Sequence, residues 1–298
     1  MKNHNSILSA AFLCLSLIFL QNNAQGVPTV FSLDPNQSQL TLSGTANGSP
    51  FVQQGPGSLT TVYTGNINAD VSASTIQFTG SSIIDARTNG VWQPLSGGAA
   101  GSAPADYGAR ATVNSPFGGV LVNVALRNVT LDVTSPVLTI INNNFNSSAL
   151  LFSFNTNSSS ALDYNASISS GSLSLAGLST NKVNSGASLT NMGGTQKITI
   201  PVDTDYVFNF NAGIPVTVLL HLTGQLVATS AAVPIFRSIV VTNQTVVLTV
   251  ENATPQSELQ TSVDLTNWFS FPVTVTNILG RTVFTAIVFG PVRFYRLQ

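Results

Sequence analysis

The sequence has very few ionisable side chains. Only 7% of its 298 residues are Asp, Glu, Lys or Arg, and the formal net charge is −1. Without a basic excess, the chain lacks the electrostatic footprint of a nucleic-acid-binding protein. Anionic membrane surfaces are disfavoured for the same reason. We therefore expect no nucleic-acid partner, and solubility must come from Ser, Thr, Asn and Gln.

The single cysteine, Cys14, lies in an N-terminal segment that is typical of a secretory signal. Lys2 precedes an apolar run over residues 7–20, and Ala24-Gln25-Gly26 places small residues at positions −3 and −1 of a cleavage site. The run of about 14 residues is too short to span a membrane. We predict a signal peptide over residues 1–26, a secreted or cell-surface protein, and no membrane span in the mature chain. The mature chain would have no disulfide and no reactive thiol.

Histidine is equally scarce, because only His221 remains after the predicted cleavage. A zinc site would need further His or Cys ligands. The chain has no Gly-x-Ser-x-Gly elbow, although counting residues does not eliminate a Ser-His-Asp triad. No phosphate-binding or dinucleotide-binding glycine motif occurs. We expect no cofactor, no metal and no enzymatic activity, with His221 on the less apolar face of a strand.

Two aspartates are close together in Asp203-Thr204-Asp205, which we interpret as an acidic loop tip. They are candidate calcium ligands, although a good calcium site needs six or more oxygens. Paired aspartates could also hydrolyse a glycosidic bond, provided that two carboxyl groups lie about 5–10 Å apart in one cleft.

Alternating hydrophobicity is the main structural signal, and it is clearest over residues 196–229. Apolar residues recur at every second position over 198–202, 206–210 and 216–222, and Asn211-Ala212-Gly213 is typical of a turn. Further turns are predicted at Asp34-Pro35-Asn36 and at the pairs Asn47-Gly48 and Asn89-Gly90. The chain is predicted to be all-β, with a large antiparallel β-sandwich or barrel.

A change in composition after Thr229 predicts a second unit, because both glutamates of the protein lie beyond it. We assign residues 27–229 to the large β domain, 230–236 to a linker, and 237–298 to a small C-terminal β-sandwich. Trp268 and Phe294 are expected to fill the core between its two sheets, with Asp264 in the turn before the tryptophan strand.

The pattern Leu259-x-x-Ser262-x-Asp264-Leu265-x-x-Trp268, followed by Phe294-Tyr295-Arg296, resembles a module at the C-termini of exported bacterial proteins. That module is fibronectin-III-like or immunoglobulin-like in appearance. The resemblance covers about a fifth of the chain and implies no catalytic role.

The larger region also resembles known proteins, through FSLDPNQSQLTLSG, GSLTTVYTGNI, GVWQPL and APADYG. These segments are similar to uncharacterised exported proteins that often carry a PEP-CTERM sorting tail, which is not found here. Leu33-Asp34-Pro35 with Ser38, and TGNINADVSASTIQF, are similar to the YceI-like barrels, with Gln37 in place of the usual His. The latter resemblance implies binding of a polyisoprenoid lipid.

The candidate binding site extends from Asp85 to Arg110. It combines a hairpin tip with a Gly-, Ala- and Pro-rich loop, and function concentrates on loops that a rigid sheet supports. Its candidate ligand-binding residues are Asp85, Arg87, Trp92, Asp106, Tyr107 and Arg110. The alternative is that Trp92 belongs to the core and that Tyr107 packs the loop down.

Together these observations predict an exported, non-enzymatic surface, matrix or adhesion protein. Its expected partners are a polysaccharide or a protein of the cell surface or matrix. One alternative is a lipid- or carbohydrate-binding barrel, and a second is an aspartate-dependent glycan hydrolase.

Overall fold

The computed structural model describes residues 26–87, 105–115, 118–166, 169–181, 186–192, 194–211, 213–231, 235–242, 245–251, 257–278, 281–287 and 294–297. Within these ranges the chain is built of antiparallel strands, with one short 3-10 helix, η2 (Ser147–Ala149). The all-β prediction is confirmed. Among the same residues, no helix is long and apolar enough to cross a membrane. The predicted signal peptide and the Asn89-Gly90 turn lie outside the described residues, apart from Gly26.

Eight strands of the largest sheet close into a ring, because the first strand of the chain pairs on one side with the fifth strand and on the other with the nineteenth. In ring order these strands are β1 (Val27–Leu33), β5 (Thr60–Val71), β6 (Thr75–Phe78), β11 (Leu138–Ile141), β12 (Asn144–Phe145), β17 (Ala187–Met192), β18 (Thr195–Asn211) and β19 (Pro215–Ser230). Closure removes the edges that an open sheet would expose.

A second strand, β2 (Gln39–Ala46), bridges the same two neighbours as β1 and continues the closure along the ring. Between β1 and β2 lies the predicted turn at Asp34, where the amide of Ser38 donates to the Asp34 carbonyl at 2.8 Å. Ser38 is fully buried, and its hydroxyl donates to the carbonyl of Val227 and accepts from the amide of Val227, both at 2.9 Å. The Val227 carbonyl also accepts the backbone amide of Asp34 at 2.8 Å, so the side chain of Ser38 supplies the partner that the Val227 amide would otherwise lack.

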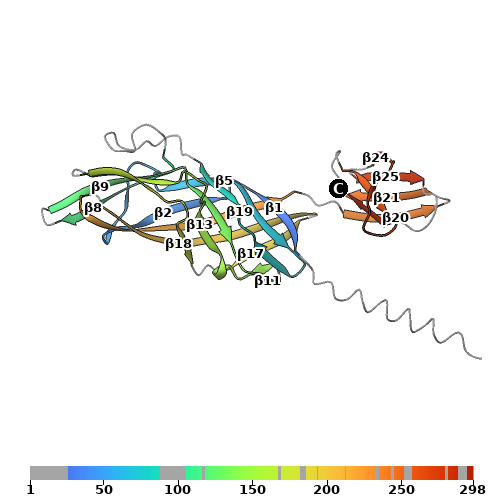
Figure 1. Ribbon diagram of the computed structural model, residues 1–298, viewed down its shortest axis with the longest axis horizontal. Helices are drawn as coiled ribbons and strands as arrows, with labels where there is room; N and C mark the ends of the chain where they lie inside the picture. The colour runs from blue at the N-terminus through green and yellow to red at the C-terminus, as the bar shows by residue number, and fades with distance from the viewer. Residues whose placement is uncertain are drawn as a thin grey trace, which may run out of the picture.

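The remaining strands of the large part extend the ring on one side and cover it on another. β7 (Ile83–Arg87), β10 (Thr130–Thr134), β13 (Leu151–Phe154) and β16 (Ser179–Asn181) branch from β5, and β3 (Ser49–Pro50) ends the path next to β2. A second sheet has the order β15 (Ser169–Ser174), β14 (Ala161–Ala166), β9 (Gly118–Arg127), β8 (Tyr107–Ser115), β4 (Val52–Gln53). β8 and β9 lie at one end of this part, and β1, β11 and β17 lie near the other (Figure 1).

The second sheet and the large sheet share one hydrophobic core. The ring of Tyr164 lies 4.5 Å from that of Phe210, and its hydroxyl donates to the carbonyl of Asn211 at 3.0 Å. Deeper in the core, the hydroxyls of Tyr63 and Tyr107 are 2.8 Å apart. Burial raises the pKa of both tyrosines, so this pair is neutral throughout the physiological range. The large part therefore combines a closed ring with two facing sheets.

The β18–β19 hairpin is the longest element, and its alternation sends apolar residues inward along its length. The expected loop tip at Asp203-Thr204-Asp205 is wrong, because these residues lie inside β18 and pair with β19. Thr204 is buried between them, so both aspartates point outward without breaking the strand. The turn expected after Asn211 is confirmed, since β18 ends there and β19 begins at Pro215.

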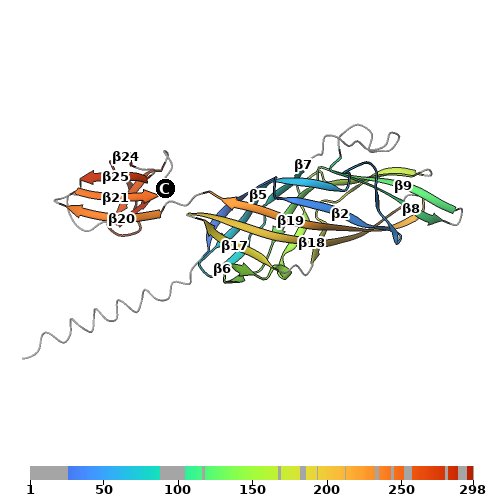
Figure 2. The same cartoon turned by 180° about the vertical axis from the view of Figure 1, so that it is seen from behind.

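The C-terminal strands form two small sheets around a separate core. One has the order β20 (Ile235–Thr242), β21 (Thr245–Glu251), β25 (Arg281–Ile287), β24 (Thr274–Ile278), and the other the order β23 (Phe269–Ser270), β22 (Leu259–Ser262), β26 (Phe294–Leu297). Val246, Leu248 and Phe284 of the first sheet are buried together with Leu259 of the second. The predicted linker at 230–236 overlaps both neighbouring strands, because Ser230 is the last residue of β19 and Ile235 the first of β20. Figure 2 shows the same strands from behind.

The prediction that Trp268 and Phe294 fill this core is wrong. Phe294 is 42% exposed, and it is Tyr295 that packs against the core and against Phe271, with ring centroids 5.9 Å apart. Adjacent residues of a strand face opposite sides, so an error of one residue exchanges the buried and exposed side chains. Trp268 is only half-buried, and the Arg296 guanidinium lies 4.4 Å from the centre of its ring.

Asp264 lies in the turn before Trp268, as predicted. Its carboxylate accepts the amide N–H groups of Thr266 and Asn267 at 2.9 and 2.8 Å, the side-chain amide of Asn267 at 2.7 Å and the hydroxyl of Ser262 at 2.9 Å. These hydrogen bonds favour the ionised form and lower the pKa of Asp264 well below its usual range.

Replacing Ser38 with alanine should destabilise the ring. The buried amide of Val227 would lose its partner, and an unsatisfied buried donor costs about 1–3 kcal/mol. Urea unfolding would measure this loss. The matched control is Ser32→Ala on the exposed side of β1, which should change the free energy of unfolding by less than about 0.5 kcal/mol. Equal effects of both substitutions would contradict the role of Ser38.

Asp264→Asn should lower the thermal stability of the C-terminal sheets at neutral pH and leave it unchanged in strong acid. A carboxyl group whose folded pKa lies below its ordinary value of 3.8 stabilises the fold above that pH. This stabilisation is lost as the pH falls through the folded pKa. Trp268 fluorescence in a Trp92→Phe background would report the melting temperature. The exposed Glu258→Gln is the control, and a variant that melts like the parent at pH 7 would contradict the prediction.

Candidate functional site

The structure separates the residues of the predicted binding site. Tyr107 is fully buried as the first residue of β8, and Arg110 is exposed three residues later. Arg87 is exposed at the end of β7. Trp92 and most of the loop lie outside the described residues. The expectation of an exposed aromatic at Tyr107 is wrong, because β8 already begins there, although its alternative role as a packing residue agrees with its burial.

Asp85 and Asp106 do come together, in a polar cluster beneath the second sheet. Asp85 accepts a hydrogen bond from the Thr130 hydroxyl at 2.6 Å, and Asp106, only 4% exposed, accepts the amide N–H of Val129 at 2.8 Å. The sequence did not single out their neighbours Arg127 and Asp163, whose side chains form a buried ion pair at 2.6 Å. Pairing across β9 and β14 places Arg127 opposite Ala161 and Asp163 opposite Ala125, so the two side chains are diagonal neighbours on one face. The periodicity of a single segment does not reveal this pairing.

The electrostatics of this cluster indicate a structural role. Burial raises the pKa of Asp106 to about 6, while the Val129 hydrogen bond and the positive charge of Arg127 act in the opposite direction, and the charge of Asp85 adds to the rise. The carboxylates of Asp85, Asp106 and Asp163 each accept a hydrogen bond from another residue of the fold. The cluster therefore anchors β7, β8, β10 and β14 where they meet.

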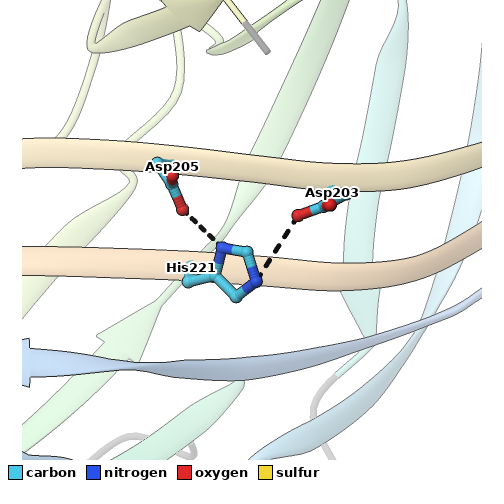
Figure 3. Close-up of polar contacts among 3 residues, drawn as sticks. All are labelled: Asp203, Asp205 and His221. Atoms are coloured by element: carbon cyan, nitrogen blue, oxygen red, sulfur yellow. Dashed lines mark hydrogen bonds and ion pairs between the residues drawn. The ribbon is translucent and has the colours of Figure 1, made fainter. Parts of the chain in front are cut away.

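His221 lies between two carboxylates on the outward face of the β18–β19 hairpin (Figure 3). Its Nδ1 contacts Asp205, and its Nε2 lies 3.4 Å from the carboxylate of Asp203. The side chains are 28% exposed for His221, 51% for Asp203 and 40% for Asp205. The expected position of His221 on the less apolar face is confirmed, and the two calcium candidates are its partners. Among the described residues, no group of three or more His, Cys, Asp or Glu side chains could hold a metal ion.

A serine lies in the same row, because Ser43 of β2 is the cross-strand partner of His221 on the side away from Asp205. Serine, histidine and aspartate are the groups of a nucleophilic triad. However, the base of such a triad must direct one ring nitrogen at the hydroxyl, and in Figure 3 both nitrogens are directed at carboxylates of β18. The arrangement therefore favours a surface cluster in which His221 contacts both carboxylates over an activated serine.

A pocket of about 360 Å³ opens at the end of the ring away from β8 and β9. Its lining comes from β1, β5, β11, β17 and β18, all of them strands of the ring, and from the turns between them. This pocket therefore lies at the mouth of the ring, and we call it the mouth pocket. Val71 and Leu189 are buried in its wall, and Ile140 is half-buried.

Three side-chain amides line the mouth pocket, from Asn143, Asn191 and Gln196. Sequence reasoning missed them. Asn143 lies in the Asn-rich stretch 142–144, and nothing in the periodicity indicates that it lies beside residues 191 and 196. The only available signal was the clustering of Asn and Gln next to strand ends. Ring closure, which brings these ends together, involves pairing between distant segments.

A second groove, of about 470 Å³, lies outside the second sheet and includes Arg110. Pro50, Val52 and Leu121 line it together with Arg110, and Val52 and Leu121 are each 48% exposed. Of the residues predicted to bind a ligand, Arg110 is the one that this groove contains.

Comparisons of the chain with protein-family models, with curated proteins and with solved structures found no match.

Asp106→Asn should stabilise the protein at pH 7 but not at pH 4. Because the folded pKa is raised from 3.8 to about 6, the ionised carboxylate costs stability that appears as the pH rises from about 4 to above 6. The difference corresponds to at most about 3 kcal/mol. Asparagine can still accept the Val129 amide, so that bond is retained. Urea unfolding of both proteins at pH 4 and pH 7 measures the effect, and a difference independent of pH would contradict it.

Proposed function

We propose that this protein is an exported, non-catalytic surface, matrix or adhesion protein. The observation that carries the proposal is how its scarce carboxylates are used: several of them accept hydrogen bonds from the backbone or pair with a cation of the same fold. A catalytic acid or base must instead be within hydrogen-bond reach of a substrate.

Asp132 illustrates this use. Its carboxylate accepts the amide N–H groups of Ser81, Ser82 and Val133 at 3.0, 2.8 and 2.7 Å, and so fixes the turn before β7 to β10. Asp106, Asp163 and Asp264 are engaged in the same way, through Val129, Arg127 and the turn at Thr266 and Asn267. Charge-assisted bonds of this kind stabilise a protein that has few other polar anchors.

The hydrolase alternative is supported by one observation, the pair of carboxylates at Asp203 and Asp205. Two residues apart on one strand, they share a face at a spacing of roughly 7 Å. Both are directed at His221 on an outward sheet face, and the two cavities described above have other linings. Carboxylates that contact His221 on an open sheet face do not form the cleft in which a glycosidic bond would be attacked.

The lipid-binding alternative would need an apolar cavity inside the ring. Large side chains occupy the shared core instead, and several are fully buried: Phe31, Tyr63, Ile76, Phe78, Phe152 and Tyr206. An interior packed in this way leaves recognition to the surface and the mouth.

The proposal predicts binding without turnover. The exported chain should sediment with, or be retained on, an extracellular polysaccharide matrix prepared from the producing cells, while the polymer keeps its length on size-exclusion chromatography. The variants Asp203→Asn, Asp205→Asn and His221→Gln should retain this binding. Shortening of the polymer by the parent protein, abolished in one of these variants, would overturn the proposal in favour of the hydrolase. Failure to bind matrix or cell surface at all would overturn it as well.

A further inference from the structure

We propose that the mouth pocket binds a neutral saccharide unit. The inference rests on the proposed matrix or adhesion function and names the ligand class for it. It is carried by three observations: the position of the mouth pocket at the end of a closed ring, its uncharged lining, and its three side-chain amides.

The size and position of the mouth pocket suit a small ligand. Ligand sites occur preferentially at the mouths of β-barrels and occupy about 300–1,000 Å³, and the mouth pocket, at about 360 Å³, is near the lower limit. A single sugar ring or a short end of a chain is the size of ligand that such a volume accommodates. A long acyl chain would need a deeper, uniformly apolar cavity.

Among the described residues, the side-chain amides of Asn143, Asn191 and Gln196 have no hydrogen-bond partner. Each amide offers two donors and an acceptor with two lone pairs. Vicinal hydroxyls of a sugar are donors and acceptors in the same pattern, so an amide can bind two of them together. Val71, Ile140 and Leu189 provide the apolar surface on which the C–H face of a sugar ring can lie.

None of the described residues that line the mouth pocket is ionisable. An anionic or cationic ligand would enter a site without a counter-charge and lose hydration without compensation. The groove at Arg110 is the contrasting case, with a cation in its wall. A neutral ligand loses less hydration free energy than a charged one when it enters the mouth pocket, so we expect the ligand to be neutral.

The ring also disfavours an extended peptide as the ligand. Peptides commonly add as a strand to an exposed sheet edge. Here β1 pairs with β5 and β19, β11 with β6 and β12, and β17 with β12 and β18, so the lining strands are flanked on both sides. Recognition must then use side chains, and the side chains available are amides.

The walls of the mouth pocket are fixed before any ligand arrives. The Ser72 hydroxyl accepts the amide of Thr75 at 2.9 Å and holds the β5–β6 turn. The Asn143 carbonyl accepts the amide of Leu189 at 2.8 Å and joins the β11–β12 turn to β17. The backbone N–H of Gln196 donates to the Ser230 hydroxyl at 2.9 Å. Preformed walls lower the entropic cost of binding.

The test is calorimetric titration of the exported chain with neutral tri- to hexasaccharides of glucose, galactose, mannose and N-acetylglucosamine, and with uronic-acid oligosaccharides of the same length. At least one neutral series should bind. Asn191→Ala and Gln196→Ala should each weaken this binding about fivefold, as expected for one hydrogen bond of about 1 kcal/mol. Ala73→Trp, which fills the mouth pocket, should abolish it. Gln39→Ala, an exposed amide on β2, is the matched control and should have no effect.

Each variant is first shown to melt like the parent, so that a lost interaction is not mistaken for lost folding. Absence of binding to all neutral series, tighter binding of the uronic-acid series, or binding that survives Ala73→Trp would each overturn the proposal. Matrix retention by Ala73→Trp equal to that of the parent would overturn the role of the mouth pocket and leave the proposed function standing. Loss of matrix retention in Ala73→Trp, together with loss of oligosaccharide binding, would support both.

Discussion

The rest of the large sheet depends on the closure between β5 and β19. β1 and β2 bridge these two strands in succession, and the turn from Asp34 to Ser38 lies between the two bridges. At this turn the Val227 carbonyl still accepts the backbone amide of Asp34, but the Val227 amide would be left unpaired in the interior. The buried hydroxyl of Ser38 accepts that amide and donates a second hydrogen bond to the carbonyl. A single small side chain thus lets the chain change direction without opening the ring.

Closure explains how a protein with so little charge can pair its backbone groups without charged residues at the edges of its sheet. An open sheet usually protects its edges with charged residues, whereas a ring satisfies the backbone of its strands internally. The few carboxylates are then available for turns and buried junctions, as at Asp132 and Asp163. Even the exposed Asp203 and Asp205 contact a side chain of the same fold, His221. Charge is used locally and in pairs, and the remaining surface is left to hydroxyls and amides.

Local patterns predicted local structure well. Alternation placed Leu220 and Leu222 inside and His221 outside, and the Asn47-Gly48 pair forms the expected turn with positive φ at both residues. The failures have physical causes. Asp203 and Asp205 flank a buried threonine, and two nearby aspartates are typical of a loop. Their contact with His221 on the paired strand is not evident from the sequence. Phe294 and Tyr295 differ by one position, and only the register with β22 decides which is buried. Ring closure and the mouth pocket depend on pairings between distant segments. The local pattern of a single sequence does not indicate which segments pair.

A surface of this composition restricts the kind of recognition that it supports. Without a net field, encounter with a partner is not steered electrostatically, and association depends on short-range contacts. Amides on a preformed wall supply such contacts, but each is individually weak. A protein that binds in this way gains from a ligand with many equivalent units close together, because effective concentration then replaces single-site affinity. A neutral polysaccharide matrix has that repetitive character. Binding to such a matrix would explain together the sparse charge of the chain, the closed ring and the amides at its mouth.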